Sequence, residues 1–154
     1  MKTKYVIDSN VLFSAFISGK DVYRLLFSEC AIYLPDYAFL EIEKYKTRIL
    51  GKTKLTEQEF KEFVITLLRN VIVIPNLLLS PITLKQAYHL CQSIDEKDTV
   101  YVATAIEFGF TLITADRQLY YGLKERNFTQ VVLLEDVIKQ LPSMKDIGTE
   151  LSEN

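Results

Sequence analysis

The chain has 154 residues, a length typical of one domain. It is 49% hydrophobic and 25% charged, as soluble globular proteins are, and no apolar run is long enough to cross a membrane. The formal net charge of −2 gives no whole-chain argument for nucleic-acid binding. The first apolar stretch is too short for a signal peptide and meets Asp8 at once, so we expect a cytoplasmic location.

Short, continuously apolar runs alternate with helical patterns along the chain. The pattern predicts strands over residues 4–7, 31–34, 71–74, 111–114 and 131–134. In the first half it predicts helix 10–17, helix 21–28 capped by Asp21, one long helix 36–50 stopped at Gly51, and helix 56–70 opened by a Thr56–Glu59 capping box. After a linker over 76–81, it predicts helix 83–93, a helix from about Asp98 to Gly109, helix 117–126 and a last helix 135–141.

This alternation is the signature of an α/β fold, in which a five-stranded parallel sheet is covered by helices on both faces. We expect one domain over residues 1–141 and a polar, loose tail over residues 142–154. The two cysteines, Cys30 and Cys91, lie far apart and match neither a disulfide framework nor a zinc site, so we expect buried thiols.

Two acids directly follow predicted strands. Asp8 comes after the first strand and Asp116 after the strand 111–114. In open α/β sheets, ligands bind outside the carboxyl ends of the strands. Each acid could equally be the N-cap of the helix that follows, although Ser9 or Asn10 could cap the first helix instead and leave Asp8 free.

A third acid, Asp98, shares a helix face with Val102 and Ala105, so we place it on the apolar side, where a carboxylate needs compensation. Asp95 fits best as the cap of that helix, with Asp98 as its partner in a capping box.

On the helix 36–50, the apolar face formed by Ala38, Phe39, Ile42, Tyr45 and Ile49 places Glu41 partly inside and Glu43 in solvent. Together, Asp8, Glu41, Asp98 and Asp116 can converge at one end of the sheet. Four close carboxylates repel unless cations join them, and Mg²⁺ or Mn²⁺ prefer such oxygen ligands.

The segments IDSN around Asp8, PDYAFLEIEKY around Glu41, IDEKDTVYVATAIEFG around Asp98 and LITADRQLY around Asp116 resemble the PIN-domain family, specifically the VapC-like toxin ribonucleases of prokaryotes. The resemblance runs from about Tyr5 to Leu141 and rests on the order and spacing of the segments.

The resemblance implies strand order 3-2-1-4-5 and a three-layer α/β/α fold. It implies a nuclease that uses one or two Mg²⁺ or Mn²⁺ ions to cleave single-stranded RNA. In this reading the four acids bind metal and are the catalytic residues, with Asn10, Thr114 and Asp95 in supporting positions. The family further implies a homodimer and a cognate antitoxin protein as partners. Apolar residues on the first helices, Phe13, Phe16, Tyr23 and Phe27, are candidates for a dimer interface.

A basic run broken by no acidic residue follows Glu43 and provides the RNA-binding candidates. They are Lys44, Lys46, Arg48 and Lys52, with Arg117 beside Asp116 as the start of a second basic group. Such cations could grip an RNA backbone, or they could simply be a solvated helix end. Two other functions stay open: a PIN-like module that binds RNA or protein without cutting, and a different metal-dependent phosphohydrolase.

Overall fold

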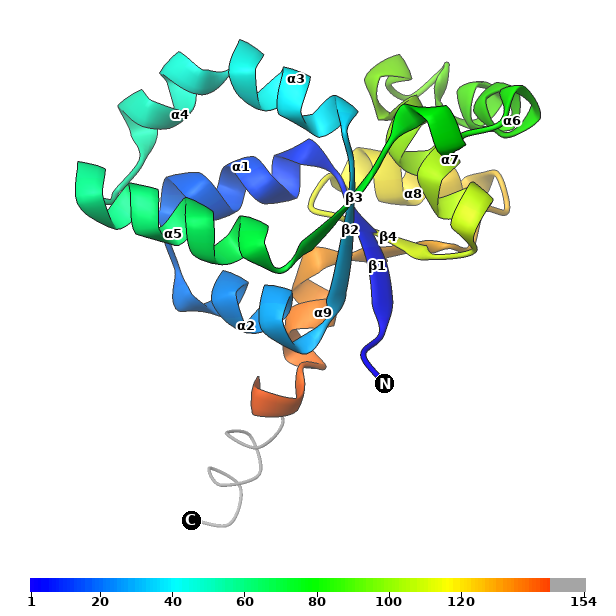
Figure 1. Ribbon diagram of the computed structural model, residues 1–154. Coiled ribbons are helices and arrows are strands. Elements are labelled where there is room, and N and C mark those ends of the chain that lie inside the picture. Colours follow the sequence, from blue (N-terminus) through cyan, green and yellow to red (C-terminus); the bar gives the residue numbers. More distant parts are fainter. Residues whose placement is uncertain (145–154) are drawn as a thin grey trace.

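The computed structural model describes residues 1–144 and contains one parallel sheet with helices on both of its faces (Figure 1). Its strands are β1 (Lys4–Ile7), β2 (Ala31–Pro35), β3 (Val71–Ile74), β4 (Thr111–Thr114) and β5 (Val131–Leu133). They lie in the order β3-β2-β1-β4-β5, and every neighbouring pair is parallel. The three-layer fold and the strand order expected from the sequence are therefore confirmed.

The central strands are hidden on both faces, which explains why their sequences are continuously apolar. Val6 and Ile7 of β1 and Leu112 and Ile113 of β4 are all fully buried. β1 pairs with β2 on one side and with β4 on the other, in a register that sets Ile7 beside Ile113. Successive strands are therefore added toward one edge of the sheet up to β3 and toward the other edge from β4 onward. The gap between β1 and β4, where this order switches, is where α/β folds place their ligands.

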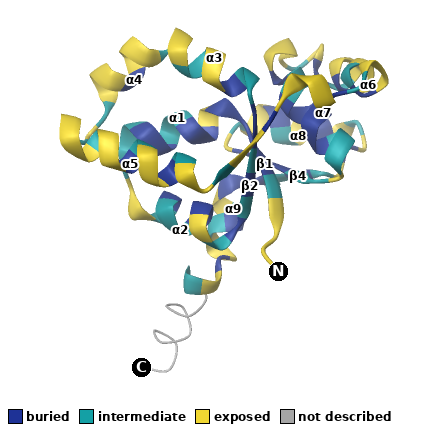
Figure 2. Ribbon diagram, viewed as in Figure 1, coloured by how far each residue is buried: buried dark blue, intermediate teal, exposed yellow. Residues whose placement is uncertain are grey.

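The helices between β1 and β3 occupy one side of the molecule, on the left of Figure 1. They are α1 (Ser9–Ser18), α2 (Asp21–Glu29), α3 (Tyr37–Lys44), α4 (Lys46–Lys52) and α5 (Glu57–Arg69). α3 and α4 contact α1 and form an outer layer above it. Most of their residues are exposed, as Figure 2 shows. The α3–α4 arm is therefore held mainly through α1.

The opposite side carries the helices between β3 and β5. These are the short turn η1 (Asn76–Leu78), α6 (Pro81–Cys91), the short turn η2 (Glu96–Asp98), α7 (Thr99–Phe108) and α8 (Arg117–Glu125). The last helix, α9 (Leu134–Lys139), contacts β4 and β5 and lies on the same side as α2 (Figure 1). α7 packs directly on β1, β2 and β4 and is the most buried helix of this layer. Its position brings the acids that precede it to the carboxyl ends of the strands.

Several local predictions are wrong. The expected helix 36–50 is two helices that break at Tyr45, and Gly51 lies inside α4, which ends at Lys52. Phe39, assigned to the buried face, is 39% exposed. Asp21 is the first residue of α2 and not its cap, because the N-cap position belongs to Lys20.

The capping box of Thr56 and Glu59 is confirmed. Gly19 and Gly109 end α1 and α7 in the left-handed conformation. Both cysteines are buried free thiols, as expected. No helix within residues 1–144 combines the length and the apolar character that crossing a membrane requires.

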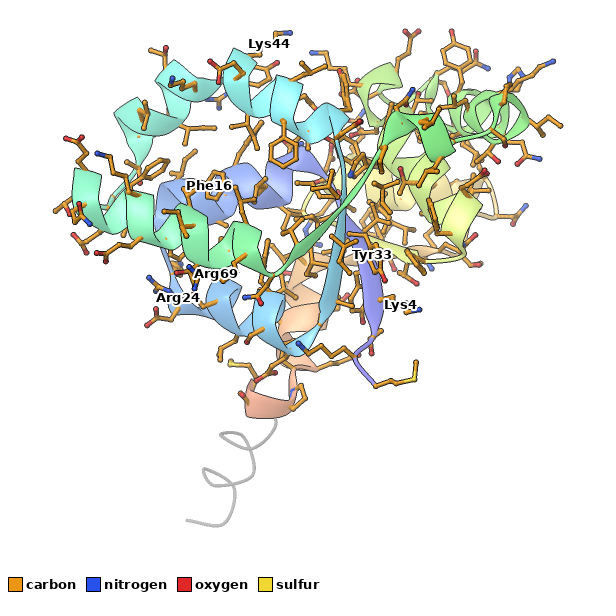
Figure 3. All side chains as sticks on the ribbon, in the orientation of Figure 1. Lys4, Phe16, Arg24, Tyr33, Lys44 and Arg69 are labelled. Carbon is orange, nitrogen blue, oxygen red and sulfur yellow. The ribbon has the colours of Figure 1, made fainter. Side chains whose placement is uncertain are left out.

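Three of the four aromatic residues proposed for a dimer interface belong to the core of one chain, and the fourth, Phe13, is partly buried and lines the pocket described below. Phe16, Tyr23 and Phe27 are at most 8% exposed, and the Phe16 ring lies between α1 and α5, against Phe60 (Figure 3). Arg24 on α2 covers Phe63 of α5 in the same layer. The argument for a dimer from these residues is therefore wrong.

The predicted tail begins as part of the fold. The hydroxyl of Ser143 donates a hydrogen bond to Glu29, and Met144 packs against the core. The rest of the expected tail, residues 145–154, lies outside the described residues, so the domain boundary near residue 141 stays a prediction.

Candidate active site

A pocket of about 470 Å³ opens where the carboxyl ends of β1 and β4 meet the starts of α1, α7 and α8. Four of its lining side chains are acidic: Glu41, Asp95, Asp98 and Asp116. Asp8 lies beneath them, 1% exposed. The structure thus brings together all four acids proposed as metal ligands, from segments up to 108 residues apart in the chain.

Asp8 is held by two different hydrogen bonds. Its Oδ1 accepts from the backbone N–H of Val11 at 3.0 Å, so Asp8 is the N-cap of α1. Its Oδ2 accepts from the hydroxyl of Thr114 at 2.8 Å. Ser9 and Asn10 do not replace it as the cap. Capping and a place beside the pocket are compatible, because the cap fixes the carboxylate at the strand end.

Thr114 connects Asp8 to the second strand-end acid. While its hydroxyl donates to Asp8, its oxygen accepts from the backbone N–H of Asp116 at 3.0 Å. Asp116 in turn is the N-cap of α8, accepting from the backbone of Gln118 and Leu119. The buried hydroxyl of Thr114 therefore sets the relative placement of two acids, while its supporting role in a metal site stays a prediction.

Asp98 is the acid with the least local support. It precedes α7 in the last position of η2, is 7% exposed, and accepts no capping hydrogen bond. Val102 and Ala105 beside it are fully buried, so the apolar face predicted for Asp98 is confirmed. The predicted capping box does not form, because Asp95 caps only the short η2 turn through the N–H of Lys97.

Glu41 enters the pocket from α3, on the opposite wall. It is partly buried while Glu43 is exposed, as the helix face predicted. Its carboxylate accepts a hydrogen bond from the hydroxyl of Tyr101, which is 1% exposed on α7. Tyr101 was missed because its spacing marks it only as a core residue.

Burial and mutual repulsion disturb the ionisation of two acids. The pKa of Asp8 is raised to about 6, chiefly by burial and further by the charges of Asp116 and Glu41. Burial raises the pKa of Asp98 to about 7, and the charges of Asp8, Asp95, Asp116 and Glu41 add to the effect. The pocket is thus a place where negative charge is poorly neutralised by the protein itself.

Only some of the predicted RNA-binding residues reach the pocket. Arg48 lines it, together with Asn10. Lys44, Lys46 and Lys52 are exposed elsewhere on α3 and α4, and Lys44 lies at the outer edge of α3 in Figure 3.

Arg117 forms an ion pair with Glu135, away from the pocket lining. Lys97 was missed, although it lines the pocket between Asp95 and Asp98. Its position in the sequence between two acids could have signalled this.

A comparison with protein families matches the family model described as PIN domain to residues 6–136. The chain belongs to the PIN-domain family. Among curated proteins, none matches the sequence. The identification from the four acidic segments is therefore confirmed by the family match over most of the chain.

Two solved structures resemble this PIN domain in fold. The crystal structure of PAE2754 from Pyrobaculum aerophilum has a TM-score of 0.62 and 16% identity, over 92% of this chain and 90% of that chain. The structure of VapBC2 from Rickettsia felis, bound to a DNA fragment from its promoter, has a TM-score of 0.56 and 18% identity, over 85% of this chain and 97% of that chain. At these identities the likeness establishes the fold.

The chemistry of the PIN-domain site fits a hard divalent cation, because its acidic donors are carboxylate oxygens. Burial, with a smaller contribution from the charges of neighbouring acids, raises the pKa of two of them, Asp8 and Asp98. Within residues 1–144, however, no three acidic, histidine or cysteine side chains are already grouped closely enough to enclose an ion. The carboxylates lie around the pocket but do not form a complete set of metal ligands.

Proposed function

We propose that this PIN domain is a metal-dependent endoribonuclease that cleaves single-stranded RNA. The observation that supports this most strongly is that Glu41, Asp98 and Asp116 line one pocket, with the buried Asp8 close enough for its charge to raise the pKa of Asp98. These acids come from four separate segments, so local helix capping alone does not explain why all four gather at this end of the sheet. Burial and neighbouring negative charges raise the pKa of Asp8 and Asp98, and a bound cation would offset the repulsion between these carboxylates.

In this proposal the four acids hold one or two Mg²⁺ or Mn²⁺ ions. Such ions activate water and neutralise developing charge on a phosphate when they are bound. Asp8 and Asp116 are fixed by backbone and Thr114 hydrogen bonds, so they supply a rigid side of the site. Asp98 and Glu41 face them from α7 and α3.

The substrate is held by cations at the rim of the acidic pocket. Arg48 and Lys97 line the pocket from opposite elements, α4 and η2. Phosphate contacts from such residues supply affinity without reading sequence. Asn10 adds a polar side chain at the start of α1. An extended single strand can place one phosphate over the acids and its neighbours on these cations.

We further propose that the protein is the toxin of a type II toxin–antitoxin pair, acts in the cytoplasm and is held by a cognate antitoxin. The fold resemblance to the VapBC2 complex of Rickettsia felis supports this context. The same acidic pocket would be the surface that an antitoxin must block to stop RNA cleavage.

A homodimer is proposed on a different surface from the one first expected. The edge strand β3 exposes Ile72 (48%) and Val73 (43%). Successive strand residues point to opposite faces, so β3 exposes one apolar side chain on each face, as well as its edge. Exposed apolar edge strands are rarely left open in stable proteins. A second copy of this chain would cover both residues.

One observation favours the alternative of a PIN-like module that binds RNA or a protein without cutting. The described acids do not form a ready-made group of three ligands. If the carboxylates cannot close on an ion, the pocket would act only as a polar binding surface.

Incubation of the purified full chain with single-stranded RNA, double-stranded RNA and a small phosphate ester tests these readings. The proposal expects cleavage of the single strand when Mn²⁺ is present and none with chelator. RNA binding without cleavage in Mn²⁺ would support the non-catalytic module. Hydrolysis of the ester alone would support a different phosphohydrolase.

A further inference from the structure

Among the four acids, Glu41 stands apart in how it is held. Asp8 and Asp116 each accept backbone hydrogen bonds at the start of a helix, and Asp98 is enclosed at the start of α7. Glu41 has the longer side chain and lies on α3, whose only buried residue is Ala38. The chain then breaks at Tyr45, directly after α3. The sheet therefore does not fix the position of this carboxylate.

Within the described residues, the hydroxyl of Tyr101 is the one hydrogen-bond donor to Glu41. Tyr101 lies three residues after Asp98 on α7, so it projects from the same part of that helix as Asp98. Its ring is 1% exposed and packs 6.3 Å from the ring of Tyr37 on α3. The residue thus links the rigid helix α7 to the loosely held helix α3, across the pocket.

The hydroxyl is the informative part of this side chain. A phenylalanine would fill the same buried volume, and a buried hydroxyl is unfavourable unless it finds a partner. The pKa of Tyr101 is raised by burial and by the hydrogen bond to Glu41, which agrees with a neutral phenol that donates to a carboxylate. A charge-assisted bond of this kind is both strong and directional.

We propose that Tyr101 is a positioning residue, which orients the Glu41 carboxylate into the pocket so that it can bind a divalent cation. This inference rests on the proposed function of the four acids. Partners of metal ligands often fix ligand orientation, and their loss weakens metal affinity by about 10- to 100-fold. The simpler alternative is that Glu41 only satisfies a buried tyrosine.

Calorimetric titration of the full chain with Mn²⁺ separates these alternatives. In Tyr101→Phe, the Mn²⁺ dissociation constant should rise on the order of tenfold. Cleavage should return toward the wild-type rate when Mn²⁺ is saturating. Tyr37→Phe is the matched control: it removes a hydroxyl from the other ring of the same pair, for which the described residues show no hydrogen bond. It should bind Mn²⁺ as the wild type does.

A double variant tests whether the hydroxyl acts through Glu41. Adding Tyr101→Phe to Glu41→Gln should weaken Mn²⁺ binding no further than Glu41→Gln does alone. Glu41→Asp withdraws the carboxylate from the hydroxyl but keeps its charge, so it should also bind Mn²⁺ more weakly. This variant replaces Tyr101→Phe in the test if Tyr101→Phe does not fold.

Unchanged Mn²⁺ affinity in Tyr101→Phe overturns the inference, as does unchanged affinity in Glu41→Asp. A further loss in the double variant overturns it as well. Failure of the proposed function is distinct, because then the wild type itself binds no Mn²⁺.

Discussion

Replacing Asp98 by asparagine should abolish RNA cleavage and yet raise the melting temperature of the metal-free protein at pH 8. The substitution keeps the size of the side chain and removes a buried charge that repels its neighbours. Burial and the charges of Asp8, Asp95, Asp116 and Glu41 hold the pKa of this carboxyl at about 7. At pH 8 the folded wild type therefore carries a charge that its surroundings oppose.

The structure sets an upper limit for the gain. Raising the pKa of Asp98 from 3.8 to about 7 corresponds to about 4 kcal/mol of lost stability once the carboxylate is ionised. Neighbouring acids relax when one charge is removed, so we expect about 1–2 kcal/mol, a common size for a single stabilising change. For a domain of this size that is roughly 2–8 °C in melting temperature.

The sign of the pH dependence follows from the direction of the pKa shift. Because the folded pKa lies above the unfolded value of 3.8, the folded state holds the proton more tightly. Stability therefore falls as pH rises from about 4 through about 7 and levels off above that. At pH 5 only part of this loss has occurred, because the wild-type carboxyl is still protonated in the folded state, so the Asn variant should gain less there than at pH 8.

Thermal melts in chelator at pH 5 and pH 8 measure both effects. Added Mn²⁺ should then stabilise the wild type by mass action and the variant much less. Glu96→Gln is the matched control, since it removes an exposed carboxylate from the same η2 turn. A gain that is equal at both pH values, or equal Mn²⁺ shifts in wild type and Asp98→Asn, would remove Asp98 from the site.

Three further outcomes are expected. Thr114→Val removes the hydroxyl that donates to Asp8 and should lower the free energy of unfolding in urea titrations by about 1–3 kcal/mol; an unchanged value would mean that this bond does not support the site. Lys97→Ala should raise the KM for RNA and weaken its salt dependence, whereas Lys44→Ala, outside the pocket lining, should leave both nearly unchanged. Val73→Lys should convert a dimer to monomers in analytical ultracentrifugation, and a wild type that sediments as a monomer at high concentration contradicts the dimer.

The strands and the strand-end acids could be predicted because their signals are local. Short apolar runs bounded by residues such as Pro35 and Pro75 mark the strands, and Asp8 and Asp116 directly follow two of them. The strand order came from the resemblance to a family, since periodicity alone does not specify which strands are neighbours. The burial of Asp98 was predictable because its helix face is apolar over the next two turns.

The features that the sequence did not reveal depend on contacts between distant segments. Tyr101 and Glu41 lie 60 residues apart, so nothing in the spacing of either indicates that they meet. The helix break at Tyr45 is hidden because the apolar pattern continues across it. Aromatic residues of the first helices, such as Phe16, were assigned to an interface because the contribution of α5 to the core was underestimated.

The central claim is that the four acids form a divalent metal site, and anomalous diffraction from crystals grown with Mn²⁺ tests it most directly. The account predicts one or two anomalous peaks in the pocket, within direct coordination distance of Asp8, Asp98 and Asp116, with Glu41 turned toward them. Wild-type crystals that diffract well in saturating Mn²⁺ and show no peak at these carboxylates would contradict it.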